Sequence, residues 1–448
     1  MSGVAAVSIG GETTHSVTAL NKQKASEDDI ESWTNARLLI IDEVSFMNTN
    51  EVEKLDERLR QLRQRYTSLF GGIHILFCGD FRQLEPCTGS PLYSPYYSDK
   101  KWITSINCYI ELFGRHRFED DPEWGAILER IRNGNYTHHD IDAINECLLQ
   151  PGTELPSTTS YCVYANRDRT AINAGIFHNL LKAHYGKSKE MPSDMIVVRA
   201  SNMTRLSKSG AKQDLKNTDK HFIYENCPDH RVTAKKGRST RGHFADPMLK
   251  LYYGLPLMLV TNEDVPNGHA NGTRVILEEV VLCGGSTPKG LELDGMQCPS
   301  VEASQVDYLL CRAEDSQTKY FKIQPKTLTC LVKAPIPKHF GHTESTINFT
   351  VQLLQLPLLT NNAITGHKLQ GQTKQDLLIS TWSKVKNWNY VSLSRVKARA
   401  GLHLMKKLPQ DVDFSVPEAL LEMIARLETL LPEDLEWDLE EDEDNSLV

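Results

Sequence analysis

Short apolar runs alternate with helix-like spacing over the first part of the chain. Leu38–Ile41 and Ile73–Cys78 are apolar runs that end in polar residues, which is typical of buried parallel strands. Between them, large side chains recur at the spacing of a helix: Val52, Leu55, Leu59, Leu62 and Tyr66. This alternation predicts a parallel sheet with crossover helices, and hence an α/β fold, over residues 1–118.

Further helices and strands are marked by their end signals. Asp121 as N-cap and Pro122 in the first turn should open a helix that Asn133-Gly134 ends. Another strand–helix unit is expected over Tyr161–Ala165 and 166–181. Near the end of the chain, Pro417 should open a last helix, whose apolar face carries Leu420, Leu421, Ile424 and Leu427.

Two segments depart from the α/β pattern. Residues 201–241 hold ten Lys or Arg against four Asp or Glu and few large apolar residues, which predicts a mobile basic insertion. A solvated loop and a DNA contact are equally compatible with it. From about residue 271 to 345, short β-like runs alternate with Gly- and Pro-rich turns, which predicts a small all-β, barrel-like insertion. Those runs are Val275–Leu282, Val306–Cys311 and Leu328–Val332.

Composition narrows the class of protein. The 448 residues are 40% hydrophobic and 24% charged, as in an ordinary soluble globular protein, and no apolar run approaches the roughly 20 residues of a membrane span. The ten cysteines form no C-x-x-C pair, so zinc and iron–sulfur sites are not expected and reduced thiols are. Residues 432–448 hold nine acids and no base; a solvated, disordered tail is the first interpretation and an interaction tail the second.

Carboxylates follow both predicted strands of the first part. Asp42 and Glu43 follow the first strand, and Gly79-Asp80 and Gln83 follow the second. Parallel strands end at one edge of the sheet, which is where open α/β sheets bind ligands. We therefore expect Asp42 to hold magnesium, Glu43 to polarise an attacking water, and Gln83 to sense a γ-phosphate.

Two arginines have the character of arginine fingers. A planar, permanently charged guanidinium suits the charge that develops on a transferring phosphoryl group. Arg395 ends the run Tyr390-Val-Ser-Leu-Ser-Arg395, and Arg117 lies in Arg115-His-Arg-Phe. For the second run the alternatives stay open, because Arg115 competes with Arg117 and either could pair with a surface acid.

These motifs resemble, in order and spacing, those of the PIF-type DNA helicases of superfamily one, relatives of the RecD-like motors. The resemblance runs from residue 2 to about 405 and rests on Ser2-Gly-Val-Ala-Ala, Thr13–Ser16, Leu38–Glu43, Gly79–Leu84, Gly366–Thr373 and Tyr390–Arg395. Lesser signatures are Glu129–Gly134, Asn166–Asn173, Gly254–Leu259 and Asn271–Thr273. It implies two RecA-like P-loop NTPase lobes, with ATP and magnesium as cofactors. It also implies 5′-to-3′ movement on single-stranded DNA and unwinding of 5′-tailed duplex DNA, in repair, recombination or telomere maintenance.

The resemblance also implies a set of ligand contacts. Thr13, His15 and Ser16 in the first lobe and His367, Lys368 and Gln370 in the second would touch the DNA backbone. Such polar contacts to phosphates bind without sequence preference. For His15 and His367 a helix-start hydrogen bond is an equal alternative. The nucleotide would contact Asp42, Gln83, Gly371 and Arg395.

The same resemblance divides the chain into domains and shows a departure. We expect an incomplete first lobe over 1–118, a second lobe over 119–270 and 346–431, the β-rich insertion over 271–345, and the acidic tail. The family's phosphate loop, G-x-x-x-x-G-K-[ST], does not occur in these 448 residues and would lie upstream of Met1. Gly186-Lys187-Ser188 has Leu181 in place of the first glycine and is interpreted as a turn. Gly366 and Leu369 also depart from the usual pattern.

Three hypotheses account for the absent loop. The sequence could be a truncated gene model of an active ATP hydrolase and helicase, a decayed transposon helicase fragment, or an inert nucleic-acid-binding pseudo-helicase. The first is favoured because Asp42, Glu43, Gln83 and Arg395 are all present. We expect an intracellular, monomeric protein without membrane contact, nuclear in the first place and mitochondrial as the alternative.

Overall fold

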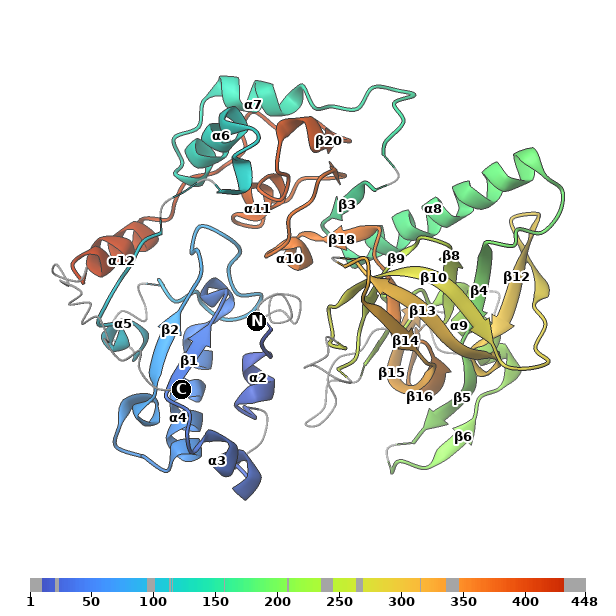
Figure 1. The fold of residues 1–448 in the computed structure, drawn as a ribbon, viewed down its shortest axis with the longest axis horizontal. Coiled ribbons are helices and arrows are strands. Elements are labelled where there is room, and N and C mark those ends of the chain that lie inside the picture. Colours follow the sequence, from blue (N-terminus) through green and yellow to red (C-terminus); the bar gives the residue numbers. More distant parts are fainter. Residues whose placement is uncertain are drawn as a thin grey trace, which may run out of the picture.

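The computed structural model describes residues 10–20, 24–94, 101–112, 114, 116–156, 158–207, 209–234, 245–262, 269–314, 316–335 and 346–430. They form two α/β lobes and a large β-rich part (Figure 1). Ser2–Ala6, Arg115 and the acidic tail lie outside the described residues. Within the described ranges, no helix is both long enough and apolar enough to span a bilayer.

The first lobe contains a two-stranded parallel sheet, as the apolar runs predict. Strand β1 (Leu38–Ile41) pairs with β2 (His74–Phe77), with Leu38 opposite His74 and Ile41 opposite Phe77. Helix α4 (Thr49–Arg63) lies between them in the chain and begins with a capping box in which Asn48 and Glu51 bond each other's backbone. Its predicted apolar positions are buried, except that Tyr66 follows the helix and is 60% exposed. Short helices α2 (Thr14–Val17), α3 (Glu27–Trp33) and α5 (Lys101–Ser105) complete the lobe.

The last helix, α12 (Glu418–Glu428), follows Pro417 as predicted but packs on the first lobe. Leu420, Met423 and Leu427 join the core that holds Ile41 and Leu55 of β1 and α4. The sequence division placed this helix in the second lobe, because an amphipathic pattern shows that one face is buried but not against which partner. Residues 418–428 therefore pack against the first lobe, although they follow the second lobe in the chain (Figure 1).

The second lobe has a four-stranded parallel sheet in the order β18-β3-β19-β20. These strands are Ala363–Thr365, Ser160–Val163, Leu377–Ile379 and Leu402–Leu404. Around it lie α6 (Pro122–Arg132), α7 (His138–Asn145), α8 (Asn166–Lys187), α10 (Gly366–Leu369) and α11 (Trp388–Leu393). The predicted strand–helix unit near residue 161 is confirmed, whereas Gly186 and Lys187 form the last turn of α8 and not a separate turn.

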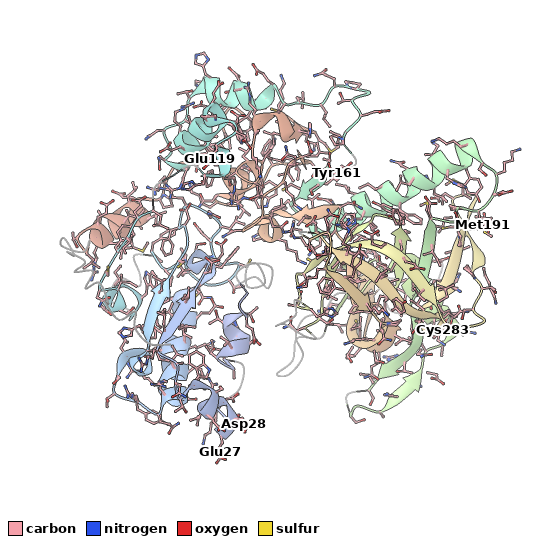
Figure 2. The ribbon with its side chains drawn as sticks, in the orientation of Figure 1. Glu27, Asp28, Glu119, Tyr161, Met191 and Cys283 are labelled. Carbon is pink, nitrogen blue, oxygen red and sulfur yellow. The ribbon has the colours of Figure 1, made fainter. Side chains whose placement is uncertain are left out.

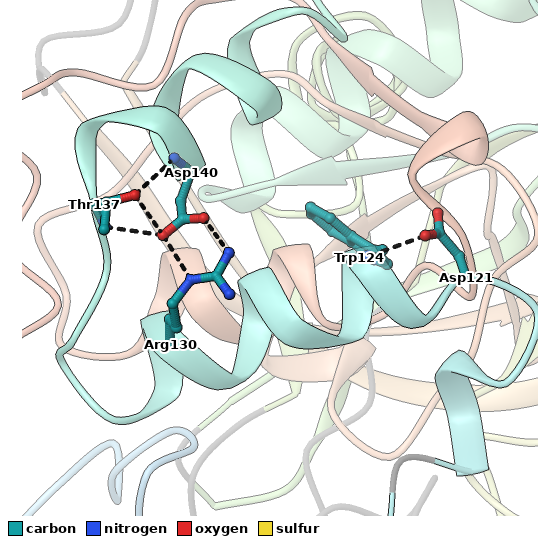
Figure 3. A network of polar contacts seen from close by, with 5 residues as sticks. All are labelled: Asp121, Trp124, Arg130, Thr137 and Asp140. Atoms are coloured by element: carbon teal, nitrogen blue, oxygen red, sulfur yellow. Dashed lines mark hydrogen bonds and ion pairs between the residues drawn. The ribbon is translucent and has the colours of Figure 1, made fainter.

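Helices α6 and α7 are joined by a buried carboxylate (Figure 3). Asp140 accepts hydrogen bonds from the Thr137 backbone at 2.9 Å and from Nε of Arg130 at 3.0 Å. At the other end of α6, Asp121 accepts from the Trp124 backbone at 2.9 Å, which confirms it as the N-cap. These bonds hold α6 firmly, and α6 contributes Trp124, Ile127 and Ile131 to the core of the second lobe.

The β-rich part begins much earlier than residue 271. Its three sheets have the orders β14-β13-β10-β9-β17, β11-β12-β4-β8 and β6-β5-β16-β15-β7. The strands run from β4 (Met195–Arg199) to β17 (Leu358–Thr360). Those between are β5 (Ser201–Leu206), β6 (Lys212–Asp214), β7 (Val232–Ala234), β8 (Met248–Tyr252), β9 (Pro256–Leu259), β10 (Arg274–Leu282), β11 (Lys289–Leu293), β12 (Met296–Glu302), β13 (Val306–Ala313), β14 (Tyr320–Ile323), β15 (Lys326–Pro335) and β16 (Thr346–Gln355).

The basic segment is ordered where the structure describes it. Residues 201–234 form β5, β6, helix α9 (Asn217–Asn226) and β7, and not the predicted mobile insertion; residues 235–241 lie outside the described residues. Most of its apolar side chains, including Met203, Phe222 and Ile223, enter one core with β15 and β16. Sequence composition misses such a segment because only one face of each strand is buried. Figure 2 shows Tyr161 of β3 where the second lobe meets the β-rich part.

Candidate active site at the junction of the two lobes

The backbone beyond β1 and β2 places two carboxylates at the carboxyl edge of the first-lobe sheet. The strands stay linked past their ends, because Cys78 donates to the Ile41 carbonyl at 2.8 Å and Val44 donates to the Cys78 carbonyl at 2.9 Å. Glu43 takes a left-handed conformation at φ 53°. Gly79 has φ 153°, and a Cβ there would lie 2.8 Å from the Val44 nitrogen, so this approach requires glycine. Asp42 and Glu43 thus leave the strand side by side, as the sequence predicts.

Glu43 contacts the second lobe directly. Nε2 of Gln370 donates a hydrogen bond to Oε2 of Glu43 at 2.7 Å. Glu43 is 8% exposed and Gln370 2%. Burial raises the pKa of Glu43, while the bond from Gln370 opposes that rise. Gln370 is also one of the residues expected to touch the DNA backbone, and in the structure its side chain lies against the carboxylate of the first lobe.

Arg117 and Arg395 meet at the same junction. Arg117 lies in a short 3-10 helix, His116–Phe118, and its Nη1 donates to the Ser394 carbonyl at 3.0 Å. Arg395 is 2% exposed; its Nε donates to the Val391 carbonyl at 2.9 Å and its Nη2 to Oγ of Ser394 at 2.7 Å. Burial, with the nearby charge of Arg117, lowers the pKa of Arg395 to about 10. Among the described residues neither guanidinium forms an ion pair, so this junction favours an anion.

The loop after β2 is held by second-lobe side chains that the sequence analysis did not single out. Arg132 of α6 bonds Asp80 through Nε at 3.1 Å and Nη2 at 3.2 Å. Asn387 donates from Nδ2 to the Gln83 carbonyl at 2.8 Å. Oε1 of Gln83 is buried and has no hydrogen-bond partner within the described part of the chain. Arg132 lies within the signature Glu129–Gly134, which was the available signal; nothing in the sequence indicated Asn387.

Asp42 fits a magnesium site that is shared with phosphates. Its side chain is half-buried, and no hydrogen bond or ion pair to it occurs among the described residues. Magnesium is usually bound by one or two carboxylates together with phosphate oxygens and water. No cluster of three or more potential metal ligands occurs in the part of the chain that the structure describes. Asp42 would therefore hold the ion only together with a phosphate, and the ion would neutralise charge on that phosphate.

The residues expected to contact the DNA strand are divided between the two lobes. On α10, His367 and Lys368 are half-buried, and removal of the Lys368 ammonium group from water lowers its pKa to about 8. Gly371 is exposed, at φ 77°. In the first lobe, Thr13 is the N-cap of α2 and its carbonyl accepts from the Ser16 nitrogen at 2.8 Å. Ser16 also donates from Oγ to Glu12 at 2.7 Å, and burial lowers the pKa of His15.

Known proteins resemble both the sequence and the fold. Residues 1–112 match the family model described as PIF1-like helicase. The "ATP-dependent DNA helicase PIF1" of Danio rerio is 25% identical over 441 residues, which cover 96% of this chain and 57% of that protein. The Xenopus laevis protein of the same name is 27% identical over 92% of this chain and 54% of its own length. The chain thus spans little more than half the length of these relatives.

Solved structures of similar proteins show the same fold. "Crystal structure of Bacteroides Pif1 bound to ssDNA" covers 95% of this chain with a TM-score of 0.63 at 20% identity, and 85% of that chain is matched. The Pif1 helicase of Candida albicans covers 96% of this chain with a TM-score of 0.62 at 20% identity, and 87% of that chain is matched. The two α/β lobes are therefore RecA-like lobes, as the resemblance of the motifs implies.

Proposed function

We propose that this chain, which is similar to PIF1-like helicases in sequence and in fold, is the motor part of an ATP-dependent DNA helicase. It would move 5′ to 3′ on single-stranded DNA and unwind duplex DNA with a 5′ tail. The observation that carries the proposal is the convergence of Glu43, Arg117 and Arg395 at the junction of the lobes. A buried carboxylate beside two guanidinium groups that form no ion pair among the described residues fits a phosphoryl-transfer site.

Each of these residues has a defined role in the proposed reaction. Glu43, whose pKa is raised by burial, takes a proton from the attacking water as the water approaches the γ-phosphate. Arg117 and Arg395 stabilise the charge that develops on the phosphoryl oxygens. Asp42 would hold magnesium, and the buried Oε1 of Gln83 would orient the water or sense the terminal phosphate. His367 and Lys368 of α10, with Thr13, His15 and Ser16 of α2, would grip the strand by its phosphates.

Hydrolysis of ATP tests the proposal in two forms of the protein. These 448 residues contain no G-x-x-x-x-G-K-[ST] sequence, so we expect the chain as it stands to release no phosphate when single-stranded DNA is added. A version extended at its amino terminus by a Pif1-type phosphate-loop segment should hydrolyse ATP and unwind a 5′-tailed duplex. In that version Glu43→Gln should abolish turnover but keep ATP binding, because it removes the base and not the phosphate contacts.

Three outcomes would contradict parts of this proposal: the identity of the base, the ability to hydrolyse ATP, and the direction of movement. Near-normal turnover in Glu43→Gln would show that the base is another residue. An extended version that binds single-stranded DNA but never hydrolyses ATP would favour the inert, nucleic-acid-binding hypothesis. Unwinding of a 3′-tailed duplex and not a 5′-tailed one would overturn the proposed direction.

A further inference from the structure

The hydrogen bond between Gln370 and Glu43 joins residues 327 positions apart and crosses from one lobe to the other. Both side chains are almost wholly buried, so the bond is shielded from water. A bond between an amide and a buried carboxylate is stronger than one between neutral groups. Any movement of the Gln370 backbone relative to β1 must therefore stretch or break a strong contact to the proposed base.

Gln370 follows directly after α10, the helix that carries His367 and Lys368, two of the residues proposed to contact DNA. This helix has only four residues and begins at Gly366, against the ring of Trp388. Its last residue, Leu369, is fully buried in the second-lobe core. His367 and Lys368 lie between these two buried ends, and Gln370 directly follows the second of them, Leu369.

Among the described residues, the observed contact uses only the nitrogen end of the Gln370 amide. Its Oε1 is buried and has no hydrogen-bond partner within the described residues, although buried amides normally use both ends. The carboxylate that it contacts belongs to a residue in a left-handed conformation, which costs energy for a non-glycine residue. The unsatisfied amide oxygen and the left-handed Glu43 backbone are the two features of this contact that another arrangement would relieve.

We propose that Gln370 is a positioning residue that transmits strand binding at α10 to the carboxylate of Glu43, and that it is not itself a strand ligand. This inference rests on the proposed function. When a strand engages His367 and Lys368, the displacement of α10 changes the bond between Gln370 and Glu43 and thereby reorients the base. Without a strand the amide holds the carboxylate in the observed contact.

Hydrogen exchange on the chain as it stands tests this inference without any need for hydrolysis. The variant is Gln370→Met, which keeps an unbranched side chain of similar length but removes the amide. The matched control is Gln372→Met, because Gln372 is also buried but bonds the Lys368 carbonyl and Arg274 instead of Glu43. Affinity for an oligothymidylate is measured by fluorescence anisotropy, and exchange is followed in the peptide that covers residues 38–47.

We expect the oligothymidylate to change exchange over residues 38–47 in the unaltered chain and in Gln372→Met. In Gln370→Met the affinity for the oligothymidylate should be equal or higher, because binding no longer works against the contact with Glu43. The change in exchange should be lost. Weaker strand binding by Gln370→Met would make Gln370 a strand ligand and overturn the inference, as would an undiminished change in exchange. Binding of the oligothymidylate to the unaltered chain without any change in hydrogen exchange over residues 38–47 would also overturn it.

A second variant covers the case in which Gln370→Met does not fold, and DNA binding by the unaltered chain tests the proposed function separately. Should Gln370→Met fail to fold by circular dichroism, Gln370→Glu keeps the size of the side chain and sets a second carboxylate against Glu43. That variant should raise exchange over residues 38–47 before any strand is added, and unaltered exchange there would contradict the inference. A failure of the proposed function is distinguishable, because the unaltered chain would then not bind the oligothymidylate at all.

Discussion

Gly366 and Trp388 fit together only because Gly366 has no side chain: a Cβ there would lie 2.3 Å from Nε1 of the indole. Trp388 is fully buried and meets Tyr164 edge to face at 6.1 Å. The position of Trp388 therefore gives the physical reason for a glycine at residue 366. The pair also sets where α10 begins.

Gly366→Ala should therefore lower the free energy of unfolding by about 1–3 kcal/mol, the usual cost of overpacking a core. It should also weaken strand binding, because α10 must shift. Urea denaturation and anisotropy measure the two effects. Gly175→Ala is the control: nothing lies within 4 Å of a Cβ in the middle of α8, so stability should rise by about 0.5–1 kcal/mol. Equal stability of the two variants would contradict the prediction.

Leu420→Ala tests whether α12 is an integral part of the first lobe. Leu420 is fully buried in the first-lobe core, whereas the adjacent Leu421 is 47% exposed. We expect Leu420→Ala to cost about 2–5 kcal/mol in the free energy of unfolding, and Leu421→Ala to cost little. The transition should be followed both by circular dichroism and by a probe in the first lobe. A similar loss for both leucines would mean that α12 does not dock as described.

The affinity for single-stranded DNA should depend on pH because the Lys368 ammonium group loses its charge as pH rises. Burial lowers the pKa of Lys368 to about 8, so its ammonium group is charged below that pH and increasingly neutral above it. Only the charged form attracts phosphates, and affinity should fall as pH rises through that range. Anisotropy titrations from about pH 7 to about pH 9.5 bracket this pKa. Lys368→Arg, which stays charged throughout, should flatten the dependence; an equally steep fall in that variant would assign it to another group.

Arg395→Ala should slow hydrolysis in the version that carries a phosphate loop. A finger that stabilises the developing charge is worth about 10³–10⁵ in rate, and a loss of that order is expected. Stability should change little or improve, because Arg395 is a buried charge without a carboxylate partner among the described residues. Arg399→Ala is the matched control, since Arg399 pairs with Glu146 near the surface. A loss of turnover in Arg399→Ala as large as that in Arg395→Ala would remove the case for a finger.

Local signals were sufficient for much of the fold. The apolar runs at β1 and β2, the Asp121 cap of α6 and the Pro417 start of α12 are each determined within a few residues, because capping and strand burial depend on nearest neighbours in the chain. The placement of Asp42 and Glu43 at a sheet edge follows likewise, since parallel strands end together.

The sequence alone also indicated the resemblance to PIF-type helicases, through the order and spacing of its motifs, and supplied the residue types that phosphoryl transfer needs. The tertiary structure decided what those residues contact: Gln370 on Glu43, Arg132 on Asp80, α12 on the first lobe, and residues 201–234 within the β-rich part. None of these contacts has a local signature. Each joins positions far apart in the chain, and a buried partner is selected by the packing of the whole molecule, which residue spacing does not encode.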